Sequence, residues 1–177
     1  MNKLEEIPAY SRLALDVERA VGNELHLRDG RRVLDLYGGH CVNSLGAGDS
    51  ELGRALSEQW ERLSFCTNLL DTDAREGFRA AFEHNLPSGE WNVFVSNSGA
   101  EANENALKLA LDAADGRERV LVFEGGFHGR TAAATAVSFS KEPQFPRAPF
   151  EVERVPWGDL EAVERGLQAG AGVCLLE

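Results

Sequence analysis

The segment VSNSGAEANENALKLAL, residues 95–111, decides the fold because it joins a predicted strand directly to a predicted helix. The run WNVFVS at residues 91–96 is short and rich in apolar residues, which is typical of a strand. Ser98 is followed three residues later by Glu101, and this S-x-x-E spacing predicts a capping box with Ser98 as the N-cap. A strand that passes straight into a helix is typical of α/β proteins.

The beginning of this helix has the chemistry of an anion site. Gly99 and Ala100 take the first helical positions, where backbone N–H groups have no partner within the helix. Neither side chain blocks a ligand, and the helix dipole favours negative charge at this end. Two interpretations stay open: the small residues bind an anion, or they only allow a tight turn. Neither a G-x-G-x-x-G after a strand nor a GK[ST] is present, so the commoner phosphate loops are excluded.

The second half of the chain alternates apolar runs with helical patterns. RVLVFE at 119–124 and GVCLLE at 172–177 are near-continuous apolar runs, as expected for strands buried on both faces. EVERVPW at 151–157 is a further candidate strand. Helices are predicted between them at 131–138 and 158–168, the latter with Asp159 as its N-cap. This alternation predicts a mainly parallel sheet covered by helices on both faces.

The first half of the chain has a different pattern. ELHLRDGRRVLDL at 24–36 alternates apolar and polar residues around Asp29-Gly30, which predicts a hairpin with a two-residue loop. Amphipathic helices are predicted within 49–63 and 73–86. We therefore expect an N-terminal segment with a hairpin at residues 1–44 and the first part of a larger α/β domain at residues 45–177, with the remainder of that domain and a C-terminal domain absent.

Composition restricts the kind of protein. A chain of 177 residues is one domain or part of a larger one, and the net charge of −11 argues against nucleic acid or an anionic membrane surface as a partner. No apolar run is long enough to cross a bilayer, and the start lacks a signal-peptide core. Cys41, Cys66 and Cys174 are odd in number, far apart and form no CxxC, which favours neither a disulfide framework nor a metal site and fits a protein of the reducing cytoplasm.

A second loop, EGGFHGRT at 124–131, also follows a predicted strand and should open at the same sheet edge. Gly125 and Gly126 let the backbone turn freely. Phe127 offers an aromatic face, and Arg130 offers a planar fork suited to a carboxylate. Together with the anion site, this loop predicts a place for a flat phosphorylated cofactor and an acidic substrate.

Both loops resemble the signature loops of class III pyridoxal-phosphate aminotransferases, in the acetylornithine and ornithine aminotransferase branch. DGRRVLDLYGGHCVNSLG at 29–46 resembles the N-terminal segment of that family, and the closing LLE resembles the start of its EP-x-Q-G motif. The resemblance implies a fold-type I transferase with pyridoxal 5'-phosphate as cofactor and a homodimer as the assembly. The chain stops at an apolar run, so we expect the first portion of a longer protein, with the remainder of the large domain absent.

The resemblance implies a function for the complete protein. It would transfer an amino group from an amino-acid-derived donor, with N-acetylornithine favoured, to the 2-oxo acid 2-oxoglutarate, in arginine biosynthesis. A related ω-aminotransferase or aminomutase stays open. So does a non-catalytic truncated or split module that binds a cofactor or a partner.

The resemblance also implies roles for individual residues. Gly99 and Ala100 would bind the cofactor phosphate, and Phe127 would stack on the pyridine ring. Arg130 would hold a substrate carboxylate. Less directly, His40 would face the substrate, and Glu177 would belong to a polar shell near the cofactor.

Three departures from the family pattern stand out. LGAGDS at 45–50 replaces the usual LGH-x-HP, and FCTN at 65–68 replaces HTSN, which leaves the donor open. The Schiff-base lysine is expected beyond residue 177. Neither Lys108 nor Lys141 is assigned to it, so no catalytic residue is predicted within this chain.

Overall fold

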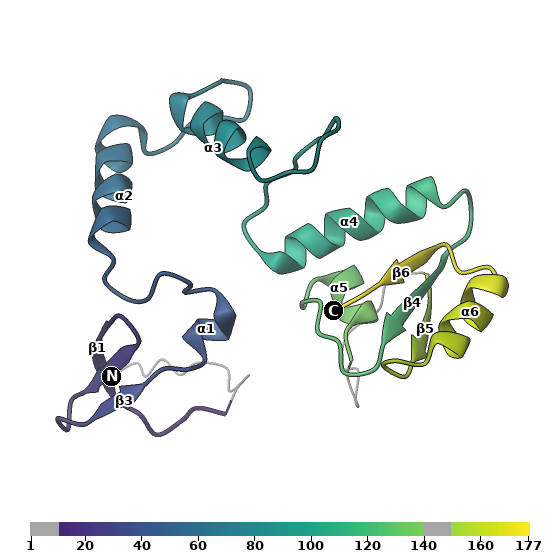
Figure 1. Cartoon of the computed structure of the whole chain (residues 1–177), viewed down its shortest axis with the longest axis horizontal. Coiled ribbons are helices and arrows are strands. Elements are labelled where there is room, and N and C mark those ends of the chain that lie inside the picture. Colours follow the sequence, from purple (N-terminus) through teal and green to yellow (C-terminus); the bar gives the residue numbers. More distant parts are fainter. Residues whose placement is uncertain (1–10, 140–149) are drawn as a thin grey trace, which may run out of the picture. The chain divides into compact units, whose positions relative to one another are not determined.

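The computed structural model describes residues 11–139 and 150–177. The chain forms two compact units, Met1–Pro87 and Ser88–Glu177, and each is described by itself (Figure 1). The domain boundary predicted between residues 44 and 45 stays a prediction.

The first unit begins with a three-stranded antiparallel sheet in the order β1-β2-β3, formed by Val17–Val21, Glu24–Leu27 and Arg32–Leu34. Val21 pairs with Glu24, so Gly22-Asn23 is a two-residue hairpin loop between β1 and β2. Neither β1 nor this turn was predicted, although Gly-Asn between strand-like runs is a known hairpin signal.

The predicted hairpin between β2 and β3 is present, but its loop is longer than predicted. Leu27 donates its N–H to the carbonyl of Arg31 at 2.9 Å, and Gly30 donates to the carbonyl of Leu27 at 3.0 Å. Three residues therefore lie in the loop, not two. Gly30 has φ +86°, the left-handed conformation that such three-residue loops require at this place.

The helices of the first unit are α1 (Gly38–Cys41), α2 (Ser50–Leu63) and α3 (Asp73–Glu83). The Asp49 carboxylate caps α2 by accepting the N–H of Leu52 at 2.7 Å, and the Thr72 hydroxyl caps α3. Both amphipathic helices predicted from the sequence are confirmed. Their apolar stripes are exposed within this unit, with Trp60 of α2 72% exposed.

The second unit contains six elements in chain order: α4 (Gly99–Ala113), β4 (Arg119–Phe123), α5 (Ala132–Val137), β5 (Glu151–Val155), α6 (Leu160–Gln168) and β6 (Val173–Leu175). The three strands form a parallel sheet in the order β5-β4-β6. The Asp159 carboxylate caps α6 by accepting the N–H of Ala162 at 2.9 Å, as predicted. The predicted parallel sheet is confirmed.

The strand predicted at residues 91–96 is absent. A strand needs a hydrogen-bonded neighbour, and the three described strands of this unit pair only with one another. The apolar side chains of the segment stay exposed as a result, with Phe94 69% exposed. An apolar run alone therefore did not suffice to form a strand here.

Helices cover both faces of the sheet, as predicted (Figure 1). Successive residues of a strand point to opposite faces. Val120 and Val122 of β4 accordingly pack against Leu107 of α4 on one face, with α5 beside it. Leu121 packs against Ala162 of α6 on the other face. The central strand β4 is thus buried on both faces, and the loop 124–131 begins directly after it.

The expected burial of β6 on both faces is wrong. Cys174 is exposed, and its neighbours Val173 and Leu175 are only partly buried. Cys174 pairs with Leu121 and so faces the same side of the sheet, which is the side of α6. α6 contacts β5 at the opposite edge of the sheet, so it leaves Cys174 uncovered.

Among the described residues, no helix is both long and apolar enough to cross a membrane.

Candidate functional site

The amino end of α4 has the open geometry predicted from the sequence. The Ser98 hydroxyl accepts the N–H of Glu101 at 3.2 Å, which confirms Ser98 as the N-cap. The Glu101 carboxylate accepts the N–H of Asn97 at 2.8 Å, one residue before the position that a capping box uses. Within the described residues the N–H groups of Gly99 and Ala100 have no hydrogen-bond acceptor, and the space beside Gly99 is open. We call these two residues the anion seat.

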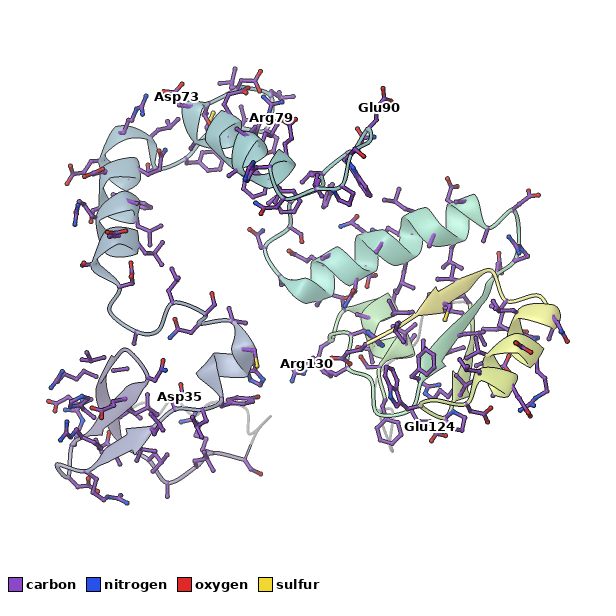
Figure 2. All side chains as sticks on the ribbon, viewed as in Figure 1. Asp35, Asp73, Arg79, Glu90, Glu124 and Arg130 are labelled. Atoms are coloured by element: carbon purple, nitrogen blue, oxygen red, sulfur yellow. The ribbon has the colours of Figure 1, made fainter. Side chains whose placement is uncertain are left out.

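The loop 124–131 follows the carboxyl end of β4 and carries the predicted aromatic and cationic groups. The Phe127 side chain is 52% exposed, and Cζ of Arg130 lies 5.0 Å from the centroid of its ring. This is a cation–π contact, which holds the guanidinium over an aromatic face. Figure 2 shows Arg130 projecting from the loop that precedes α5.

The anion seat and this loop touch. A Cβ built on Gly129 would lie 2.5 Å from Cβ of Ala100, so only a glycine lets the loop approach the helix this closely. The Asn103 side-chain amide donates to the carbonyl of His128 at 2.8 Å, one turn further along α4. The structure thus brings the predicted anion seat and the predicted aromatic loop together.

Glu177 also meets the loop. β4 and β6 are parallel neighbours, so residues that follow each strand emerge at the same edge of the sheet. The Glu177 carboxylate accepts the backbone N–H of Phe127. Of the residues predicted for the site, five therefore gather here: Gly99, Ala100, Phe127, Arg130 and Glu177.

His128 lies beneath the loop and is only 5% exposed. Its Nε2 is buried and has no hydrogen-bond partner among the described residues. Burial lowers the pKa of the imidazole, while the negative charge of Glu177 raises it by a smaller amount, so the net pKa is below the ordinary value. The ring is therefore neutral near neutral pH.

Ser138, which was not predicted, directly follows α5 and makes hydrogen bonds to the loop 124–131. Its hydroxyl accepts the N–H of His128 at 2.9 Å, and its single proton has two carbonyl acceptors, Ala134 at 2.8 Å and Gly129 at 3.1 Å. The N–H of Phe139 donates to the carbonyl of Gly126 at 2.8 Å. A serine after an alanine-rich helix carries no distinctive signal in the sequence.

Glu104 of α4 was also not predicted, and it joins α4 to Thr131 of the loop and to the first turn of α5. Its carboxylate accepts hydrogen bonds from the Thr131 hydroxyl and from the N–H groups of Ala133 and Ala134. Burial is the largest single influence on the Glu104 carboxyl and would raise its pKa. The three hydrogen bonds, with the charge of Lys108, outweigh burial and lower the pKa below its ordinary value.

His40 lies in the first unit, next to Tyr37, whose hydroxyl hydrogen-bonds the imidazole. His40 and Cys41 both have φ +61°, a left-handed conformation that is costly for residues other than glycine. Such strain is common at functional sites. The predicted role of His40 toward a substrate stays a prediction.

The prediction that neither Lys108 nor Lys141 is catalytic stays a prediction. Lys108 is exposed on α4, and its charge acts on Glu104. Lys141 lies outside the described residues.

Comparison with known proteins decides the family. A family model described as aminotransferase class-III matches residues 7–170. The chain belongs to the class-III aminotransferases. This family depends on pyridoxal phosphate, so the family and the cofactor predicted from the sequence are both confirmed.

Curated class-III relatives cover nearly the whole chain. The acetylornithine aminotransferase of Methanopyrus kandleri is 34% identical over 170 residues, which is 95% of this chain and 43% of that protein. The acetylornithine aminotransferase of Mycolicibacterium smegmatis is 35% identical over 151 residues, or 84% of this chain and 38% of that protein. The chain therefore spans about two fifths of the length of these relatives.

Solved structures confirm the fold. The ornithine aminotransferase from Toxoplasma gondii matches with a TM-score of 0.82 at 23% identity, over 96% of this chain and 42% of that one. The ω-transaminase from Pseudomonas jessenii in complex with PMP matches with a TM-score of 0.76 at 19% identity, over 94% of this chain and 44% of that one. The predicted fold-type I class is thereby confirmed.

The described residues fit the cofactor of this family. The two unpartnered N–H groups of the anion seat suit a phosphate, since they lie at the positive end of α4. The half-exposed ring of Phe127 suits a flat heterocycle.

Proposed function

We propose that the complete protein transfers an amino group from N-acetylornithine to 2-oxoglutarate, with pyridoxal phosphate as cofactor. The observation that carries this proposal is the Arg130–Phe127 pair on a loop that touches the anion seat. It combines a carboxylate fork, an aromatic face and free N–H donors on adjoining elements. The curated relatives described above are acetylornithine aminotransferases, which favours N-acetylornithine as the donor.

In this proposal each residue of the site has one task. Gly99 and Ala100 bind the phosphate through their N–H groups, and Phe127 stacks on the pyridine ring. Arg130 holds a carboxylate of the substrate. Glu177 fixes the turn that presents the Phe127 ring, because it accepts the N–H of that residue.

The cofactor, when bound, supplies the electron sink for amino-group transfer, whereas the protein binds and orients the reactants. Because burial lowers the pKa of His128, its imidazole adds no positive charge beside Arg130 near neutral pH. Arg130 is then the only cation of the loop 124–131, which favours one defined carboxylate position. We assign no catalytic residue in this chain.

An ω-aminotransferase is the second candidate. Solved structures with this fold include ω-transaminases, and the LGAGDS segment departs from the pattern of the acetylornithine branch. The donor that the complete protein accepts distinguishes the two candidates.

Further proposals rest on the resemblance to the acetylornithine and ornithine aminotransferase branch. We propose that the protein is a homodimer, that it acts in the cytoplasm in arginine biosynthesis, and that His40 faces the substrate.

The test measures glutamate formed by the complete protein from 2-oxoglutarate and N-acetylornithine. Arg130→Gln should raise the KM for 2-oxoglutarate by roughly tenfold to a hundredfold, because a bidentate charged contact is lost. Arg165→Gln is the matched control, since Arg165 lies exposed on α6 and pairs only loosely with Glu161 at 3.7 Å. Its KM should stay at the wild-type value. Absence of glutamate with any amino donor, or equal effects of the two variants, would contradict the proposal.

A further inference from the structure

The first turn of α5 is capped by a residue from another helix. Thr131 is the N-cap by position, but its own side chain makes no capping hydrogen bond. The Thr131 hydroxyl donates instead to Oε2 of Glu104 at 2.6 Å. The N–H groups of Ala133 and Ala134 donate to the same oxygen at 3.0 and 3.2 Å. The carboxylate of α4 therefore does what a local N-cap ordinarily does for α5.

A carboxylate suits this place for two reasons. It only accepts hydrogen bonds, and three donors converge on it. Its negative charge also lies at the amino end of a helix, where the helix dipole favours it. The lowered pKa of Glu104 agrees with this geometry, because it keeps the group ionised well below neutral pH.

The contact fixes more than the end of α5. Arg130 directly precedes Thr131, so anchoring the Thr131 side chain and the turn that follows restricts the backbone from which Arg130 projects. The same side of α4 holds the preceding loop residues. Ala100 abuts Gly129, and Asn103 binds the carbonyl of His128. Positions 100, 103 and 104 are spaced i, i+3 and i+4, which places them on one helix face.

We propose that Glu104 is a positioning residue for Arg130, acting through Thr131 and the first turn of α5. The helix that binds the cofactor phosphate at its end would also fix, from its side, the arginine that holds the substrate carboxylate. This inference rests on the proposed function, because it assigns Arg130 to the acidic substrate.

Two variants of the complete protein test this inference. Glu104→Ala removes all three hydrogen bonds, whereas Glu104→Gln keeps an acceptor oxygen and loses the charge. Glu104→Ala should raise the KM for 2-oxoglutarate by about tenfold, because small errors in the placement of a binding group have large effects. The kcat and the affinity for pyridoxal phosphate should change less than about threefold, since neither depends on Arg130 in this scheme. Glu104→Gln should recover most of the loss.

The control is Asp112→Asn, which neutralises an exposed acid on the same helix. All of its kinetic constants should equal those of the wild type. If Glu104→Ala fails to fold, the KM of Glu104→Gln decides, and it must then exceed the KM of the control by at least about twofold.

Amide hydrogen exchange gives a readout that does not depend on activity. Exchange in residues 128–134 should become roughly tenfold faster in Glu104→Ala and stay unchanged in Asp112→Asn, because hydrogen bonds to a charged acceptor are lost. Unchanged exchange, or parallel losses in KM, kcat and cofactor affinity, would overturn the positioning role. If the wild type forms no glutamate, the proposed function fails, and so does the link to the substrate. The exchange data then still show whether Glu104 anchors the loop.

Discussion

At the scale of single residues, Gly99 and Gly129 lie where the loop 124–131 meets α4, and they differ in the space around them. Gly129 has φ +123°, and a Cβ on it would lie 2.5 Å from Cβ and 2.8 Å from Cα of Ala100. Gly99 has an ordinary helical backbone and open space around it. Contacts within the protein therefore exclude a side chain at position 129, whereas only a bound ligand would exclude one at position 99.

Substitutions at these two glycines should separate stability from cofactor binding. Gly129→Ala should lower the free energy of unfolding by about 3 kcal/mol, through overpacking and backbone strain. Gly99→Val should change the free energy of unfolding by less than about 1 kcal/mol but weaken pyridoxal phosphate binding, because the side chain crowds the anion seat. Urea unfolding and cofactor titration of both variants provide the measurement. If Gly99→Val and the wild type bound pyridoxal phosphate with equal affinity, the cofactor phosphate would not bind at the anion seat.

At the scale of elements, α6 is held against the sheet by a close approach at Gly166. A Cβ there would lie 2.6 Å from Cδ2 of Leu121, a side chain that is fully buried in β4. Gly77, in the middle of α3, has nothing within 4 Å of the same point. Both are helical glycines with ordinary backbone angles, so they differ in packing and not in local conformation.

Alanine at these two positions should therefore have opposite effects. Gly166→Ala should lower the free energy of unfolding by about 1–3 kcal/mol, because the added methyl group would overlap the fully buried side chain of Leu121. Gly77→Ala should raise it by up to about 1 kcal/mol, which is the difference in helix propensity. Chemical denaturation of the purified protein measures both changes. A stabilising Gly166→Ala would show that α6 does not pack on β4 as described.

At the scale of the whole molecule, the two units differ in how much apolar surface they bury. Among the described residues, Leu27 is the only buried hydrophobic residue of the first unit, whereas the second unit has two clusters around β4. The second unit also contains both groups beside the loop whose pKa values are lowered by folding, His128 and Glu104. We expect the stability of this unit to depend on pH through them.

The sign of the pH dependence follows from the direction of the two shifts. A group with a lowered pKa in the folded state contributes stability that is complete above its unfolded pKa and is lost as pH falls through the folded one. The contribution of His128 should therefore decline below about pH 6.5 and that of Glu104 below about pH 4.5. Urea unfolding at several pH values should show the free energy of unfolding falling in two stages. His128→Gln should abolish the upper stage, and its persistence in that variant would assign it to another group.

Local sequence signals determined the elements that depend on neighbours a few residues away. Ser98 and Asp159 were predicted as N-caps because a cap bonds to an N–H three residues later. β4 was predicted from its apolar run, and the loop that follows it from its glycines and Arg130. The family was predicted from this loop and from the segment 95–111, because both resemble the signature loops of the family.

The tertiary structure alone decided which elements pair and what covers them. Residues 91–96 have the composition of a strand but no neighbour in the described sheet, and β6 is apolar but only partly covered. The contact of Glu104 with Thr131 joins residues 27 positions apart, so no local pattern marks Glu104 as a cap. Local signals arise from short-range hydrogen bonds along the chain. Pairing and burial arise from the path of the chain in space, which one sequence pattern does not determine.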